Sequence, residues 1–535
     1  MPAFAIYLLL VLIAGTPKDT GIILLDDSHT ICCYKGNKYV ITQNRVNERE
    51  FFWNKPEPAA LYLISLETGE RRKIAESKNG LLLHATLSPE ENFAIWYDQA
   101  KARFCIYQIS IAVTRQLPGS IIAIPRWLAG DQLLIAYDEY DIWKFNPVTL
   151  QSTCITEKYG RKHKTIFRLL TDSMLIAFNT KSKKNGFWQM SSSTPRCLTM
   201  DDCLYYFPVH PLDEYQPLKA KNANTWLLYR QYADSPPILY TTTDFREFRP
   251  LSTPSQTNGS ATLLHFKGIT GILYKPVPFK PQNKYPLILT AYGKYSDNLH
   301  HYIPLQHSDG TLNIPWYTTN GYLVFVPDIT TKKGNPGPGI ARTIIKSVHH
   351  LKKYPFVDGS RIGIQGHSFG GWITNYIITH TNLFAAAQES AGPTDFISGY
   401  GSIRKQTGAT LQPVYETGQN NMGHPPWEKT RKYVKNSPVL RADHITTPLL
   451  MLHNEDDNAV PFSQAVELFT ALRRLQQPVW LLKYRNEGHQ LQSFSARLDF
   501  TRKQQEFFDH YLKGKPAPEW MQNLQEQPDS INGPP

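Results

Sequence analysis

The amino-acid sequence predicts two parts, an all-β N-terminal region built from repeated strands and a C-terminal α/β domain with a mostly parallel sheet. Three observations lead to this prediction. Turns and strands recur through the first half, buried strands alternate with helical stretches through the second half, and a glycine-flanked serine stands between a strand and a helix. Because a chain of 535 residues is long for one hydrophobic core, two separate cores are expected.

The N-terminal region, from about residue 26 to residue 260, repeats a polar turn followed by an aromatic-rich strand. Copies begin at Leu87, Leu128, Leu169 and Lys221, and each is followed by a second short strand and another turn. The unit recurs every 37 to 52 residues, the size of a four-stranded propeller blade. Four or five such units predict a partial β-propeller-like repeat domain. The alternative is a β-sandwich with irregular strands, because any all-β chain can imitate these repeats.

The second half of the chain has a different pattern of apolar residues. The stretches Tyr285–Gly293 and Gly321–Ile329 are continuous apolar runs, as strands buried on both faces of a sheet require. Helical patterns that begin at Ala341, Ala465 and Thr501 alternate with such strands. This alternation predicts an α/β domain over residues 261–515.

A candidate nucleophile stands in the stretch that follows Arg361. An apolar strand runs into Gly366-His367-Ser368-Phe369-Gly370, and a helical pattern follows. The strand-to-helix turn of an α/β-hydrolase is so tight that only glycines two residues before and after the serine leave room for the neighbouring backbone. The motif alone is weak, but its flanking strand and helix indicate an α/β-hydrolase with Ser368 as nucleophile.

A serine nucleophile needs a base, and the base needs an acid that orients it. Asp456 and Asp457 follow one buried-type strand, and His489 follows the next. Because the carboxyl ends of parallel strands meet at one edge of the sheet, these residues are expected beside Ser368. Taken singly, Asp457 reads as a turn residue and His489 as a surface residue. The ordered trio instead predicts a Ser–Asp–His triad.

Acyl transfer also requires donors for the oxyanion that forms on the substrate. One expected donor is the backbone N–H of Phe369, directly after the nucleophile. Tyr292, at the end of a strand, could supply the other through its hydroxyl, although a lone tyrosine is more often a core residue.

These motifs resemble the prolyl oligopeptidase family of serine peptidases, which includes dipeptidyl peptidase IV and acylaminoacyl peptidases. The resemblance extends from about residue 263 to residue 513 through GHSFGGW, HNEDDNAVP, NEGH and the Tyr292-Gly293 element, and it is strongest to a bacterial prolyl oligopeptidase-like branch. It implies that Ser368 is the nucleophile, Asp457 the acid, His489 the base and Tyr292 an oxyanion donor.

The resemblance also bears on finer choices. It favours Asp457 over Asp456 because Asp457 lies four residues after His453, the offset of the family's HGxxD pattern, although Asn454 replaces the glycine. It implies that Tyr400 and Trp372 line the pocket for the residue before the scissile bond. No double-glutamate motif of the dipeptidyl peptidase type stands out, so oligopeptidase, dipeptidyl peptidase and acyl-peptidase activities stay open.

The sequence therefore predicts a serine peptidase that cleaves short peptides by an acyl-enzyme route, without metal or organic cofactor. In the family that the chain resembles, a propeller caps the hydrolase and restricts entry to short peptides. Two alternatives remain: a carboxylic ester hydrolase that uses the same triad, and a propeller binding protein with a decayed active site.

Charge and cysteine content exclude some further classes. The formal net charge is +12, but Lys and Arg are scattered and form no basic stripe, so no nucleic-acid partner is expected. Six cysteines in a chain of this length make no disulfide framework, although Cys197 and Cys203 could pair. Oligomeric state is left open.

The two ends of the chain carry their own expectations. Residues 1–25 contain an apolar run, Ala3–Gly15, that is short for a bilayer span and suits either a secretory signal or a buried element. The protein is thus expected to be periplasmic or secreted in the first case and cytoplasmic in the second, without stable membrane insertion. Residues 516–535 are predicted to be a loose tail.

Overall fold

The computed structural model describes residues 29–33, 36–44, 59–78, 80–128, 130–190, 195–205, 217–253 and 260–522. Residue contacts divide the chain into two compact units. The first consists of Met1–Phe51, Lys55–Asp138 and Lys144–Thr153, and the second of Phe52–Asn54, Glu139–Trp143 and Cys154–Pro535. All residues of the site described below belong to the second unit. The predicted domain boundary at residues 260 and 261 stays a prediction.

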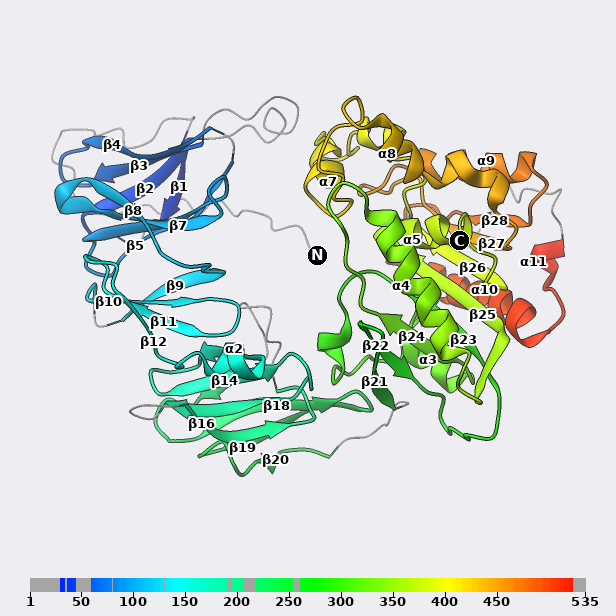
Figure 1. Ribbon diagram of the computed structural model, residues 1–535, viewed down its shortest axis with the longest axis horizontal. Helices are drawn as coiled ribbons and strands as arrows, with labels where there is room; N and C mark the ends of the chain where they lie inside the picture. Colours follow the sequence, from blue (N-terminus) through cyan, green and yellow to red (C-terminus); the bar gives the residue numbers. More distant parts are fainter. Residues whose placement is uncertain are drawn as a thin grey trace. The chain divides into compact units, whose positions relative to one another are not determined.

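The N-terminal part is all-β, as predicted. Within its described residues, five four-stranded antiparallel sheets follow one another, and in each the strands lie side by side in chain order (Figure 1). Their strands are β1 (His29–Cys33), β2 (Tyr39–Asn44), β3 (Ala59–Ser65), β4 (Arg71–Ser77); β5 (Leu82–Leu87), β6 (Phe93–Asp98), β7 (Arg103–Gln108), β8 (Val113–Gln116); β9 (Ala123–Leu128), β10 (Leu133–Tyr137), β11 (Ile142–Phe145), β12 (Ser152–Cys154); β13 (Thr165–Leu169), β14 (Met174–Asn179), β15 (Asn185–Met190), β16 (Pro195–Asp201); and β17 (Leu218–Lys219), β18 (Trp226–Tyr232), β19 (Ser235–Thr242), β20 (Arg249–Pro250).

The aromatic residues of these repeats form core rather than surface. In the second unit, Phe187 of β15 and Trp226 of β18 belong to one buried cluster that also contains Tyr205 and Phe245. The ring centroids of Phe187 and Phe245 are 4.5 Å apart, and those of Phe187 and Tyr205 are 5.1 Å apart. The alternating aromatic pattern in the sequence thus reflects side chains that pack between consecutive sheets.

The C-terminal part is an α/β-hydrolase domain built on one eight-stranded sheet, in the order β21-β22-β24-β23-β25-β26-β27-β28. The first two strands, β21 and β22, form an antiparallel hairpin, and β22 pairs antiparallel with β24. The other six strands pair in parallel, in the order β24, β23, β25, β26, β27 and β28. The strands are β21 (Ala261–Phe266), β22 (Ile269–Tyr274), β23 (Tyr285–Thr290), β24 (Leu323–Pro327), β25 (Val357–His367), β26 (Ala386–Ser390), β27 (Leu449–Leu452) and β28 (Val479–Leu482).

Helices cover both faces of this sheet (Figure 1). Alternate residues of β23 show why: Leu287 and Leu289 join one buried cluster, and Ile288 joins another. The first cluster includes residues of α4 (Pro336–Leu351), α5 (Phe369–Ile378) and α9 (Ser463–Arg474), and the second includes residues of α3 (Ile314–Thr319) and α10 (Phe494–Lys513). The other α-helices of the described residues are short: α6 (Phe396–Tyr400), α7 (Gln412–Glu416), α8 (Thr430–Lys435) and α11 (Glu519–Gln522) in the C-terminal part, and α2 (Tyr159–His163) between two sheets of the N-terminal part.

The helix expected from Ala341 begins five residues earlier, at Pro336. Proline is suited to the first turn of a helix because the N–H that it lacks would have no partner there. Cys197 and Cys203, which could have paired, are both free thiols. Cys203 lies in the buried aromatic cluster, whereas Cys197 is exposed on β16.

The expectations for the ends of the chain fall largely outside the described residues. The apolar segment of residues 1–25 lies there entirely, and of the expected tail the structure describes only residues up to 522, including α11. In the parts that the structure does describe, no helix is both long enough and apolar enough to cross a membrane.

Candidate active site

Ser368 occupies the turn between β25 and α5. Its backbone has φ of 58° and ψ of −118°, a conformation that non-glycine residues rarely adopt and that costs energy. A Cβ added to Gly366 would lie 1.9 Å from the carbonyl oxygen of Gly370, and one added to Gly370 would lie 2.5 Å from that of Ala291. The turn can therefore form only with glycine at both positions, as in a nucleophile elbow.

Asp457 and His489 come together from the loops that follow β27 and β28. The distance from His489 Nδ1 to Asp457 Oδ2 is 2.7 Å, and the Asp457 side chain is fully buried. Its other oxygen accepts the backbone N–H groups of Ala459 and Val460. Burial alone would raise the pKa of the Asp457 carboxyl, but hydrogen bonds from His453 and His489 outweigh it and hold the pKa well below its usual range. Asp457 is thus a buried anion that fixes the orientation of the His489 ring.

The adjacent acid has a different environment. The Asp456 side chain is 54% exposed, and its carboxylate lies 3.2 Å from Lys405 Nζ. Although the two acids are neighbours in sequence, only Asp457 of the pair accepts the hydrogen bond from His489.

His453 and Glu389 form a buried layer behind Asp457. His453 Nε2 lies 3.0 Å from the Val460 carbonyl oxygen and 3.3 Å from Asp457 Oδ2. Burial by itself would lower the pKa of the His453 imidazole, but Asp457 raises it above the ordinary value. Burial also raises the pKa of the Glu389 carboxyl to about 7, although His453 and the Gly392 N–H favour its charged form. In the sequence, His453 served only as the residue from which Asp457 was counted, and Glu389 was missed. The available signal for Glu389 was a charged residue inside an apolar strand.

His367 connects the elbow to the loop of the candidate base. Its Nε2 donates a hydrogen bond to the His489 carbonyl oxygen at 2.9 Å, and the two ring centroids are 4.7 Å apart. Burial lowers the pKa of the His367 imidazole to about 4, so the ring is neutral at ordinary pH. The residue directly before Ser368 therefore contacts the residue predicted to be its base.

Tyr292 lies against the first turn of α5. Its ring meets that of Phe369 edge to face at a centroid distance of 6.1 Å, and Tyr292 is 50% exposed. A Cβ added to Gly370 would lie 3.5 Å from the Tyr292 ring. Tyr292 is thus not a core residue, and it stands beside the backbone expected to supply the other oxyanion donor.

The two predicted pocket residues have little or no exposed surface. Trp372 is fully buried and donates its indole N–H to the Asn436 carbonyl oxygen at 2.9 Å, so it offers no surface to a substrate. Tyr400 is 4% exposed and donates its hydroxyl to Glu416 at 2.7 Å. Trp427 packs on Tyr400 and is 72% exposed, and sequence reasoning did not single it out.

Within the described part of the chain, no group of three or more His, Cys, Asp or Glu side chains is placed to hold a metal ion. The chemistry that the observed arrangement supports is proton transfer by His489, which is hydrogen-bonded to a buried carboxylate and contacts the residue before a strained serine.

Comparison with known proteins finds a family match in the second half of the chain. A family model described as the prolyl oligopeptidase family matches residues 311–515. The uncharacterized peptidase YuxL of Bacillus subtilis is 28% identical over 228 residues, which are 42% of this chain and 34% of that protein. Dipeptidyl-peptidase 5 of Porphyromonas gingivalis is 28% identical over 257 residues, which are 44% of this chain and 35% of that protein. The chain thus covers about a third of the length of these curated relatives.

Solved structures resemble the chain over most of its length. A puromycin-hydrolyzing peptidase of Mycobacterium tuberculosis superimposes with a TM-score of 0.64 at 16% sequence identity, and the match covers 92% of this chain and 80% of that one. At this identity the likeness establishes the fold.

Proposed function

The chain carries a prolyl oligopeptidase family domain at residues 311–515, and from this premise we propose that it is a serine peptidase that hydrolyses peptide bonds of short peptides. The observation that carries the proposal is the 2.7 Å hydrogen bond between His489 and the buried Asp457, on loops beside the Ser368 elbow. The names of its relatives, which are peptidases, support the same reaction class.

The proposed mechanism follows from this hydrogen bond. With the Nδ1 proton of His489 donated to Asp457, Nε2 is free to take the proton from Ser368 as its hydroxyl attacks the scissile carbonyl. The tetrahedral oxyanion is stabilised by the Phe369 N–H and the Tyr292 hydroxyl. His489 then gives its proton to the leaving amine, and a water molecule hydrolyses the acyl-enzyme by the same steps in reverse.

Covalent labelling tests the proposal most directly. A fluorophosphonate probe reacts only with an activated serine, so we expect peptide mapping to find the label on Ser368. Turnover of a matched amide and ester pair then separates a peptidase from an esterase. Absence of label, or cleavage of the ester without cleavage of the amide, would contradict the proposed function.

Replacing Tyr292 with phenylalanine tests the oxyanion site. The change removes one hydroxyl donor and little volume from a half-exposed side chain. We expect kcat to fall by roughly 10²- to 10³-fold with KM nearly unchanged, because the lost hydrogen bond forms mainly in the transition state. Steady-state kinetics on a dipeptidyl p-nitroanilide measures both constants. A change confined to KM would instead assign Tyr292 to substrate binding.

A further inference from the structure

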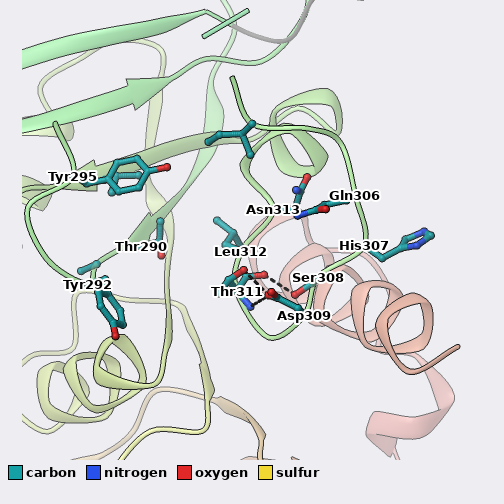
Figure 2. A pocket seen from close by; sticks show the side chains of 13 residues that line it. Thr290, Tyr292, Tyr295, Gln306, His307, Ser308, Asp309, Thr311, Leu312 and Asn313 are labelled. Atoms are coloured by element: carbon teal, nitrogen blue, oxygen red, sulfur yellow. Dashed lines mark hydrogen bonds between the residues drawn. The ribbon is translucent and has the colours of Figure 1, made fainter. Parts of the chain in front are cut away.

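A small cavity opens beside Tyr292, between the end of β23 and residues 306–313 (Figure 2). Its volume is about 280 Å³. This lies at the lower end of ligand pockets and suits one long side chain rather than a whole ligand of drug size. The lining residues are Thr290, Ala291, Tyr292, Tyr295, Ile303, Gln306, His307, Ser308, Asp309, Thr311, Leu312, Asn313 and Val326.

The wall of this cavity is tied to the loop that carries His489. The Leu491 N–H donates to the Asp309 carbonyl oxygen at 2.9 Å, and Gln490 Nε2 lies 3.4 Å from Asp309 Oδ2. On the other side, Gln365 of the strand that leads to Ser368 donates to the Gly310 carbonyl oxygen at 3.1 Å. The cavity therefore adjoins the base side of the site, where His489 must protonate the leaving amine.

Three aliphatic hydroxyl groups of the lining keep acceptor lone pairs free rather than protons. Thr290 donates its hydroxyl proton to Gln365 Oε1 at 3.0 Å, and Ser308 donates to the Thr311 carbonyl oxygen at 2.5 Å. Thr311 donates to Asp309 Oδ1 at 2.7 Å. Because each of these protons is already used inside the protein, each hydroxyl can offer a ligand only a lone pair.

Asp309 gives the cavity its charge. It is the one carboxylate among the lining residues, which include no Lys or Arg, and no ion pair joins it to another described residue. His307 carries the one imidazole among the lining residues, and Figure 2 shows its ring directed away from Asp309. One carboxylate beside three acceptor hydroxyls matches a cationic donor.

We propose, on the basis of the function proposed above, that this cavity receives the side chain of a lysine or arginine in the leaving segment of the substrate. Asp309 is its counter-charge and determines the preference. The acyl side of the substrate is not involved, because the contacts of the cavity wall run to the loop after His489 and to the elbow strand.

Three substrates with the same acyl portion test this inference. Two are quenched fluorescent peptides with lysine or norleucine as the first leaving residue, and the third is a p-nitroanilide that has no leaving residue. We expect the wild-type protein to cleave the lysine peptide with a kcat/KM about five- to tenfold above that of its norleucine counterpart, the order expected of a partly shielded ion pair. In Asp309→Asn the ratio should fall to about one, and Asp309→Glu should restore part of it.

Asp456→Asn is the matched control, since it removes an exposed carboxylate that does not line the cavity, and it should keep the wild-type ratio. Equal cleavage of the two peptides by the wild-type protein would overturn the inference even if no Asp309 variant folds. A lysine preference that survives in a folded Asp309→Asn would also overturn it. If the wild-type protein cleaves neither the two peptides nor the p-nitroanilide, that result would instead count against the proposed peptidase function itself.

Discussion

Ser368→Ala is expected to lower kcat for peptide hydrolysis by on the order of 10⁵- to 10⁶-fold, the largest effect of any single substitution in this protein. The acyl-enzyme cannot form without the hydroxyl. An alanine on the strained backbone at this position offers no other group that could replace the nucleophile. The measurement is the steady-state rate on a short chromogenic peptide, with burst-phase acylation followed in parallel.

Two further variants make this result specific. Ser360→Ala changes an exposed serine on the same strand and should leave kcat at the wild-type value. The double variant Ser368→Ala/His489→Ala should be no slower than Ser368→Ala alone, since the triad acts as one unit. If Ser368→Ala kept more than about a hundredth of the wild-type kcat, another residue would be the nucleophile.

The second large effect is expected at Asp457. Asp457→Asn keeps the size of the side chain but presents an amide to His489, so the imidazole can adopt the tautomer that cannot act as a base. We expect kcat to fall by about 10³- to 10⁴-fold. Because hydrogen bonds from His453 and His489 hold the pKa of Asp457 well below its usual range, this carboxyl stays ionised at mildly acidic pH, and acidification to pH 5 should not reproduce the variant.

Asp456→Asn is the natural comparison, because the two acids are adjacent and only their environments differ. Asp456 is exposed and pairs with Lys405, and its loss should cost less than about threefold in kcat, as expected for a surface ion pair. Kinetics of both variants on one substrate, with thermal unfolding to confirm that each is folded, decides between them. A larger loss in Asp456→Asn would move the orienting role to that residue.

Most of the fold could be predicted because it follows from local periodicity. The apolar runs at β23 and β24 indicated strands buried on both faces, and their alternate residues do enter two different cores. The aromatic repeats before residue 260 indicated antiparallel four-stranded units, which the sheets confirm. Element boundaries do not follow from periodicity alone: the start of α4 depends on a proline that the periodic pattern does not include.

The candidate triad could be predicted because Ser368, the Asp456-Asp457 pair and His489 follow successive strands, an order that allows few other arrangements in a parallel sheet. Within the acid pair, only the family resemblance favoured Asp457, and the hydrogen bond to His489 depends on the tertiary structure. The sequence did not show that Trp372 is buried in the core, or that Glu389 and His453 lie behind Asp457. Nor could it reveal that Asp309 stands close to Gln490, 181 residues away. Each of these depends on contacts between distant loops, and burial and charge arise only when those loops are packed together.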